Sequence, residues 1–373
     1  MTGSGYSRNI FNKSLVVTIS NQLKAVFSNF DCDNFIDNAS SFSKDSGLKA
    51  RCNIIADALV EFLPNDYSFS AKIIKSTFEP VKNNQNNWEN FLFMPYAVYV
   101  EKKGCKKEYL EISFNLLKEI TKRFTSEFSI RTFLINFPVE TLDVFHKWVH
   151  DENPNVRRLV SESSRPKLPW ANEIQLFKKN PYPCIELLQV LKNDDSKYVQ
   201  KSVANHMNDI SKSNPDIALN VLSRWSKENK PNINWIIKHA LRNELKKGNK
   251  RALTLMKYSL SPKIILTNFK LNKTSLKIGD SLTFSFMVTN VGENDEKLMI
   301  DYICYYVRLK NKISPKIFNL KSIVLQKQQS ITIKKEHFFK TLSTRKLYPG
   351  NHKISLRVNC KLFGENPFVL TLK

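Results

Sequence analysis

The chain has 373 residues, of which 42% are hydrophobic and 25% are charged, a balance typical of a globular protein with room for two domains. Its 58 Lys and Arg side chains outnumber its 34 Asp and Glu side chains and give a formal net charge of +24. Such a charge attracts polyanions, nucleic acid first of all, and a basic soluble protein with no such partner is the alternative.

The cysteines and the apolar runs exclude several other classes. The six cysteines lie far apart and form no Cys-x-x-Cys pair, which argues against a zinc or redox motif and fits reduced thiols. The most apolar run, residues 91–100, is too short to span a bilayer, and the first residues show no secretory signal. We therefore expect a monomeric cytoplasmic protein without a membrane partner.

Helical periodicity dominates the chain up to about residue 260. Apolar residues recur at helical spacing in 48–62, 109–124, 185–191 and 217–225. Polar boundaries that contain proline separate these segments, as at Asn153-Pro154, Asn214-Pro215 and Lys230-Pro231. The first 260 residues are therefore predicted to be mostly α-helical.

A degenerate repeat runs through the second half of this region. Residues 156–162, 199–205 and 236–242 each have an apolar first position and a basic third position. Their offsets, roughly 43 and 37 residues, are typical of HEAT-like helix pairs that stack into a solenoid. The three third positions, here called the basic ladder, are Arg158, Lys201 and Lys238. On a concave face they would line a groove, and ordinary solvated charges at helix starts are the alternative.

The pattern changes after Pro262. Short alternating segments rich in β-branched residues appear at 263–269, 281–289, 303–309, 322–333 and 353–359. They predict a smaller all-β sandwich over 261–373, after a HEAT-like domain over 1–260. The net charge is about +13 on the part after Pro262 and about +11 on the rest, so both parts should attract a phosphate backbone.

Common catalytic signatures are absent from the sequence, and the pair His146/His150 is a weak metal signal. The informative residues lie between 125 and 209. Glu127 is a carboxylate among apolar residues, either reserved for chemistry or paired with Arg131 four residues on. Trp170 follows Pro169 after a basic loop and could cover a sugar or base face, or anchor packing.

Asp209 completes this group of candidate catalytic residues. Helical spacing places it on one face with Lys201 and Asn205, and a helix-end charge is the alternative. Two carboxylates and an aromatic ring in a basic groove suit a reaction with a cationic transition state.

Several segments resemble the AlkC branch of the bacterial AlkC/AlkD alkylpurine DNA glycosylases, in the subgroup with a C-terminal immunoglobulin-like domain. The hexapeptide Arg-Pro-Lys-Leu-Pro-Trp at 165–170 and the run Ser-Val-Ala-Asn-x-x-Asn-Asp at 202–209 are specific in combination. Further matching segments are 30–35, 48–51, 63–67 and 121–128. The chain departs from the family at Lys167, where Arg is more common, and at Asn359-Cys360, where Asn-Gly is usual.

The resemblance implies a monofunctional glycosylase that needs no metal or cofactor. It would release cationic bases, 3-methyladenine and also 3-methylcytosine, from double-stranded DNA without flipping them into a pocket, in the bacterial cytoplasm at the nucleoid. Glu127, Trp170 and Asp209 match the family's active-site residues. The residues expected to contact DNA are Arg131, Arg157, Arg158, Arg165, Lys167, Lys201, Asn205, Lys238 and Arg242.

Two other functions fit the sequence. A non-catalytic HEAT-repeat protein that binds damaged or branched DNA would keep the basic surface, whereas keeping Glu127, Trp170 and Asp209 favours catalysis. A HEAT-repeat adaptor for proteins would usually have an acidic or apolar concave face.

Overall fold

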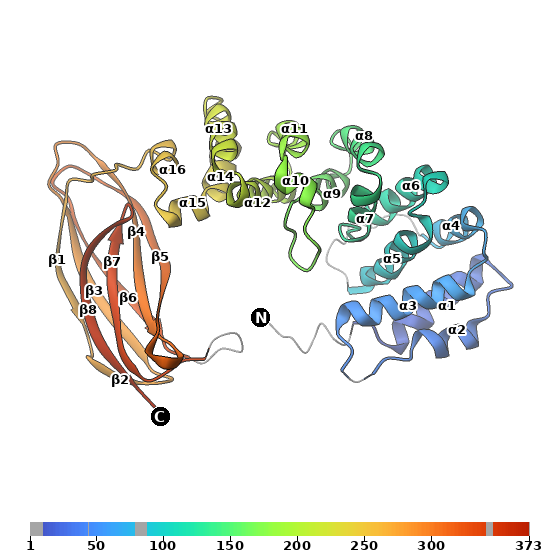
Figure 1. The fold of residues 1–373 in the computed structure, drawn as a ribbon, viewed down its shortest axis with the longest axis horizontal. Coiled ribbons are helices and arrows are strands. Elements are labelled where there is room, and N and C mark those ends of the chain that lie inside the picture. The colour runs from blue at the N-terminus through green and yellow to red at the C-terminus, as the bar shows by residue number, and fades with distance from the viewer. Residues whose placement is uncertain (1–9, 44, 79–87, 341–345, 373) are drawn as a thin grey trace. The chain divides into compact units, whose positions relative to one another are not determined.

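The structure is a computed structural model that describes residues 10–43, 45–78, 88–340 and 346–372. The chain forms two compact units (Figure 1). The first contains Met1–Asn214 and Pro231–Ile236, and the second contains Pro215–Lys230 and Ile237–Lys373. Within the described ranges, no helix has both the length and the apolar character to cross a membrane. The predicted domain boundary after residue 260 stays a prediction.

The first unit is built of short helices joined by tight turns. Its helices are α1 (Lys13–Val26), α2 (Cys32–Ala39), α3 (Leu48–Phe62), α4 (Tyr67–Ser76), η2 (Trp88–Leu92), α5 (Phe93–Gly104), η3 (Lys107–Tyr109), α6 (Leu110–Thr121), α7 (Ser129–Asn136), α8 (Pro138–Trp148), α9 (Pro154–Ser163), α10 (Gln175–Lys179), α11 (Tyr182–Leu191) and α12 (Lys197–Ser213). Helix α14 (Pro231–Ala240) begins in this unit and ends in the second.

Helices two or three apart in the sequence pack side by side. Helix α3 contacts α5, α5 contacts α7, α4 contacts α6, and α9 contacts α11 and α12. This order is that of HEAT-like helix pairs, and it confirms the predicted fold. The apolar first positions of the repeat, Val156, Val199 and Ile236, are all fully buried, because each lies on the face of its helix that meets a neighbour.

The second unit joins the last helices to a β-sandwich. Its elements are α13 (Pro215–Ser226), the end of α14, α15 (Arg242–Lys247), α16 (Lys250–Leu255), β1 (Ile264–Leu271), β2 (Ser275–Lys277), β3 (Ser281–Asn290), β4 (Glu296–Val307), η4 (Leu309–Asn311), β5 (Ile313–Leu325), β6 (Ser330–Phe338), β7 (Gly350–Val358) and β8 (Lys361–Thr371). One sheet has the order β1-β3-β6, and the other has the order β2-β8-β7-β4-β5.

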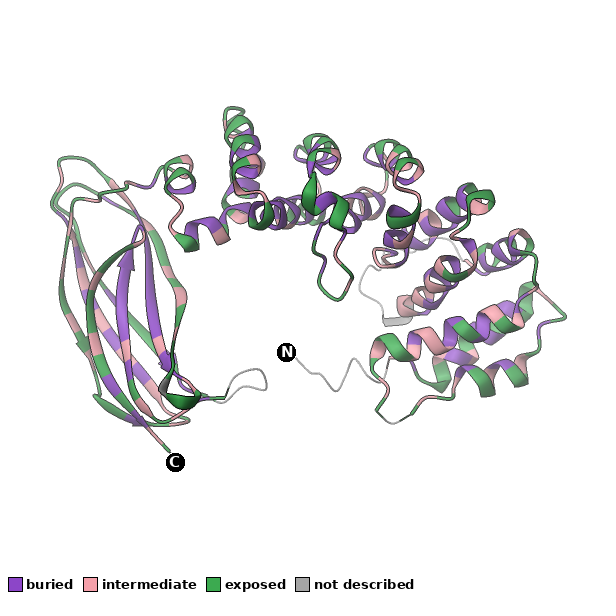
Figure 2. Ribbon diagram, viewed as in Figure 1, coloured by how far each residue is buried: buried purple, intermediate pink, exposed green. Residues whose placement is uncertain are grey.

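Alternation along the strands makes the core of the sandwich. In β3 every second residue from Leu282 to Asn290 is buried, whereas β4 and β7 are buried along most of their length, as the purple strands in Figure 2 show. Phe284 and Tyr302 meet edge to face between the sheets, with ring centroids 5.1 Å apart. The sandwich also holds the end of the helical region, since Arg357 Nη1 donates to the carbonyl of Lys246 at 2.8 Å.

The prediction of one strand over 322–333 is wrong. Strand β5 ends at Leu325 and β6 begins at Ser330, and the two strands belong to different sheets. The connecting residues are polar, and Gln328 has a φ of 59°, in the left-handed region rather than the extended region of a regular strand. The predicted strand 303–309 begins and ends too late, because β4 extends from Glu296 to Val307.

Candidate active site

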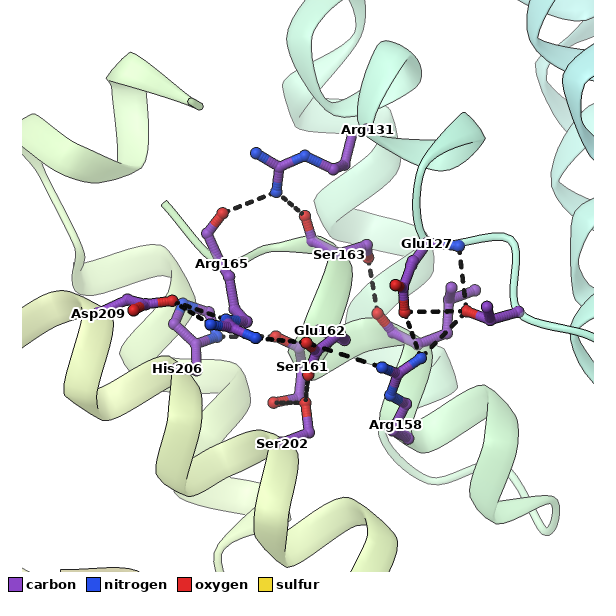
Figure 3. Close-up of polar contacts among 12 residues, drawn as sticks. Glu127, Arg131, Arg158, Ser161, Glu162, Ser163, Arg165, Ser202, His206 and Asp209 are labelled. Atoms are coloured by element: carbon purple, nitrogen blue, oxygen red, sulfur yellow. Dashed lines mark hydrogen bonds and ion pairs between the residues drawn. The ribbon is translucent and has the colours of Figure 1, made fainter. Parts of the chain in front are cut away.

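Five charged side chains of alternating sign run through the first unit, and we call them the ion chain. They are Glu127, Arg158, Glu162, Arg165 and Asp209. Glu127 lies just before α7, Arg158 and Glu162 lie one turn apart on α9, Arg165 follows α9, and Asp209 lies on α12. Because α9 packs against α12, segments far apart in sequence meet here. Figure 3 shows Glu127 and Asp209 at opposite ends, with Glu162 between them.

Each neighbouring pair in the ion chain is in direct contact. Arg158 donates through Nη1 to Glu127 Oε2, and its Nη2 lies 3.7 Å from Glu162 Oε1. Arg165 donates through Nη1 to Glu162 Oε1. Arg165 also contacts Asp209 Oδ2 through Nη2 at 2.6 Å and Nε at 2.7 Å. Such paired, charge-assisted hydrogen bonds hold both partners in one geometry.

The ion chain is largely removed from water, yet its central carboxylate, Glu162, stays ionised. Burial alone would raise the pKa of Glu162. The opposing effect of Arg158 and Arg165 is larger, and it holds this pKa below its ordinary value. The Ser202 hydroxyl adds a hydrogen bond to Glu162 Oε2 at 2.6 Å. The central carboxylate is therefore negative at neutral pH and fixes both guanidinium groups.

The two terminal carboxylates differ in their surroundings. Glu127 Oε2 accepts hydrogen bonds from Arg158 and from the Thr125 hydroxyl, whereas its Oε1 meets no donor among the described residues. Asp209 has both oxygens engaged, Oδ2 by Arg165 and Oδ1 by Lys212 at 2.8 Å. The side chain of Asp209 is 2% exposed and that of Glu127 is 12% exposed. At the Glu127 end of the ion chain, one carboxylate oxygen, Oε1, therefore stays open.

A buried histidine lies beside the ion chain. His206 is fully buried on α12, and its Nδ1 lies 2.9 Å from the carbonyl oxygen of Ser161. Since a carbonyl only accepts, Nδ1 carries the proton, and Nε2 has no partner among the described residues. Burial and the nearby Arg165 lower the pKa of His206 to about 3, so the ring is neutral.

Trp170 lies on an open connection between α9 and α10, residues 164–174, which we call the Trp170 loop. Figure 1 shows this segment extending away from the helices. Its base is closed by a hydrogen bond from the Ile174 amide to the Pro166 carbonyl at 3.0 Å, and Leu168 is buried. Trp170 is 85% exposed and has a φ of 64°, a backbone region costly for a residue with a side chain. A side chain so exposed does not anchor packing.

Glu127 and Asp209 do not have the alternative roles that the sequence left open for them, a local ion pair and a helix-end charge. Glu127 pairs with Arg158 rather than with Arg131 four residues on. Asp209 lies within α12 and is buried, so it is not a helix-end charge. Lys201 on the same helix is exposed and Asn205 is half-buried.

Four of the arginines expected to contact DNA are engaged inside the protein. Arg158 and Arg165 belong to the ion chain. Arg157 binds both oxygens of Asp194, at 2.6 and 2.9 Å. Arg131 is buried and donates to backbone carbonyls.

The remaining expected DNA contacts lie at the surface. Lys167 is exposed and lies 3.3 Å from Glu173. Lys238 and Arg242 are exposed as well, and they belong to the second unit. The basic ladder is thus not uniform, because Arg158 serves the ion chain whereas Lys201 and Lys238 are exposed.

Sequence reasoning missed Glu162, His206 and Ser202 as members of the site. One signal was available, the spacing of four residues between Arg158 and Glu162, which predicts an ion pair on a helix. The roles of His206 and Ser202 depend on the packing of α12 against α9, which no local pattern specifies.

The architecture defines a class of protein, HEAT-like helical repeats followed by an immunoglobulin-like sandwich. Residues 265–372 match the family model described as the C-terminal immunoglobulin-like domain of the uncharacterised protein YhaZ. The chain is 33% identical over 353 residues to YhaZ of Bacillus subtilis, covering 94% of this chain and 96% of YhaZ.

A solved structure extends the comparison to the whole fold. It is the alkylpurine DNA glycosylase AlkC of Pseudomonas fluorescens, bound to DNA containing an abasic site analog. The match has a TM-score of 0.91 and 32% identity, and it covers 98% of this chain and 99% of AlkC. The chain belongs to the family of AlkC and YhaZ, which confirms the resemblance found in the sequence.

Proposed function

We propose that this protein is a DNA glycosylase that removes alkylated bases in base-excision repair. The observation that carries the proposal is its similarity to AlkC, which extends over 98% of the chain with a TM-score of 0.91. The site adds independent support. Glu127 and Asp209 lie at the two ends of the ion chain, and Trp170 is exposed on the loop that also contains Arg165, a member of the ion chain.

The proposed substrates are bases that alkylation has made cationic, 3-methyladenine and also 3-methylcytosine, in double-stranded DNA. Such a base leaves as a neutral molecule when it takes the electron pair of its bond to C1′. The deoxyribose then gains oxocarbenium character, and water adds to C1′ and loses a proton. Because the leaving base needs no protonation, the main task of the protein is to stabilise positive charge on the sugar.

The three site residues divide this task. Glu127 and Asp209 contribute negative charge, and the open Oε1 of Glu127 can orient the attacking water and accept its proton. Trp170 would lie against the sugar and add a cation–π interaction. A Trp on an exposed loop can meet the lesion while the base stays in the helix, as a mechanism without base flipping requires.

Phosphate contacts would come from the exposed residues Lys167, Lys201, Lys238 and Arg242, from half-buried Asn205 and from the basic sandwich. Such contacts supply affinity without sequence preference and weaken as salt rises. Arg131, Arg157, Arg158 and Arg165 instead shape the site from within. We propose that the protein acts as a monomer on DNA in the bacterial cytoplasm.

The test is to incubate the protein with methylated duplex DNA and to identify the released bases by mass. We expect free 3-methyladenine from the wild type and a loss of most of the rate in Glu127→Gln and Asp209→Asn, with DNA binding retained. Glu186→Gln, at an exposed position on α11, is the matched control and should keep the wild-type rate. No base release by a wild-type protein that binds DNA would favour the non-catalytic DNA-binding function.

A further inference from the structure

Arg131 lies four residues after Glu127 and binds the segment that carries Trp170. It lies in the first turn of α7 and is 3% exposed. Its Nη1 donates to the carbonyls of Ser163 and Arg165, both at 2.7 Å, and its Nη2 donates to the carbonyl of Asn172. Figure 3 shows the guanidinium reaching the first two of these acceptors.

The first two acceptors lie where α9 ends. The last carbonyls of a helix have no partner within the helix, and a buried carbonyl without a donor costs free energy. Arg131 satisfies Ser163 and Arg165 there, and its positive charge also suits the negative end of the helix dipole. Burial lowers the pKa of Arg131 to about 10, so the group is charged at neutral pH.

The third acceptor lies on the returning limb of the Trp170 loop. Asn172 follows Trp170 by two residues, and Arg165 begins the outgoing limb. One planar guanidinium therefore donates hydrogen bonds to both limbs of the loop at once. The compact ammonium group of a lysine cannot donate to both carbonyls from this position. The Trp170 side chain is 85% exposed, so its backbone, rather than packing around the ring, sets its direction.

We propose that Arg131 is the positioning residue that fixes Trp170 relative to the two carboxylates. Helix α7, which carries Arg131, begins two residues after Glu127. The side chain of Arg165, whose carbonyl Arg131 binds, holds Asp209. Arg131 itself touches no substrate in this proposal, which rests on the proposed function.

The first experiment measures single-turnover base release by Arg131→Lys. We expect a release rate about tenfold to a hundredfold below wild type with affinity for methylated DNA within about twofold, because misplacement by about 1 Å has this kind of cost. Arg123→Lys is the matched control. Arg123 is a half-buried arginine that, like Arg131, donates to a backbone carbonyl, that of Glu119 at 2.9 Å. It should keep the wild-type rate.

The second experiment reports on the loop without using activity. In protein labelled with 5-fluorotryptophan, the ¹⁹F resonance of Trp170 is assigned by its disappearance in Trp170→Phe. We expect it to shift and sharpen in Arg131→Lys, while the resonances of the buried Trp148 and Trp225 stay in place. In Arg131→Ala, added guanidinium at millimolar concentration should restore both the resonance and part of the rate, and equal sodium chloride should not.

Wild-type values for both the Trp170 resonance and the release rate in Arg131→Lys would overturn the proposal. So would a slower rate with an unmoved Trp170 resonance and no guanidinium rescue. If the wild type released no base, the proposed function would fall, whereas the ¹⁹F spectra would still show whether Arg131 holds the loop. The two failures are therefore distinguishable.

Discussion

His206 gives the stability of the first unit a specific dependence on pH. The ring is fully buried and neutral, and its pKa is lowered from 6.5 to about 3 by burial and by Arg165. Between these two values the unfolded chain binds a proton that the folded protein excludes. Stability is therefore lost as the pH falls through this window. In His206→Asn the side-chain amide can still donate to the Ser161 carbonyl, but the titrating group is gone.

The size of the effect follows from the two pKa values. One proton taken up only by the unfolded state changes stability by about 1.4 kcal/mol per pH unit once the pH is well below 6.5, so the wild type should lose about 2 kcal/mol between pH 7 and pH 5 through His206. The variant should lack this loss. Carboxyl groups titrate mainly below pH 5, so they contribute little to the change in stability between pH 7 and pH 5.

The assay is urea unfolding of both proteins at pH 7, 6 and 5, followed by circular dichroism. His352 also has a lowered pKa through burial, so the wild-type slope has a second source, and the difference between wild type and variant isolates His206. Exposed His146→Asn serves as the control for the substitution itself. Equal slopes in wild type and His206→Asn would refute the reasoning, as would an NMR titration of His206 with a midpoint near 6.5.

Three further predictions concern stability and binding. Glu162→Gln should destabilise the protein by about 3 kcal/mol in thermal unfolding at pH 7, because two buried guanidinium groups lose their shared charge; an unchanged melting temperature would contradict this. Cys360 has a φ of 68°, so Cys360→Gly should stabilise by about 1 kcal/mol, whereas Cys360→Ala keeps the strain and should not. Lys201→Gln should reduce by about one the slope of log affinity for DNA against log salt, measured by fluorescence anisotropy, if Lys201 contacts a phosphate.

The helical part of the fold could be predicted because its signals are local. An apolar face of period 3.6 marks the helices, and the predicted 48–62 coincides with α3. The helix signals depend on residues within one or two turns of each other. The repeat was visible because each copy keeps an apolar first position, and Val156, Val199 and Ile236 are all fully buried.

The sandwich was harder to predict because strand ends depend on partners far away in sequence. Residues 322–333 look like one strand, but Leu325 pairs with Glu296 and Ser330 pairs with Thr289 in the other sheet. Short β2 pairs in parallel with the last strand, β8, and has no strong pattern of its own. Only the turn at Gln328 separates the two sheets along this stretch.

For the site, residue types could be predicted but their partners could not. Glu127, Trp170 and Asp209 stood out from the resemblance and from their neighbours in sequence. The roles of Arg131, Arg157, Arg158 and Arg165 were predicted from charge alone, and charge does not distinguish a phosphate contact from a buried ion pair. That distinction depends on burial, which for Arg165 is set by α12, more than 30 residues later in the chain.

The alternating order of the ion chain explains how buried carboxylates can stay available to a cation. An isolated buried carboxylate would gain a proton, because burial disfavours its charge. Pairing with Arg158 and Arg165 keeps Glu162 ionised, and the same two guanidinium groups hold Glu127 and Asp209. Asp209 has both oxygens occupied and can act only through its charge, whereas Glu127 has an open oxygen and greater exposure. Removing charge at Asp209 should therefore disturb the ion chain and its stability, whereas Glu127→Gln should act chiefly on the water that attacks the sugar.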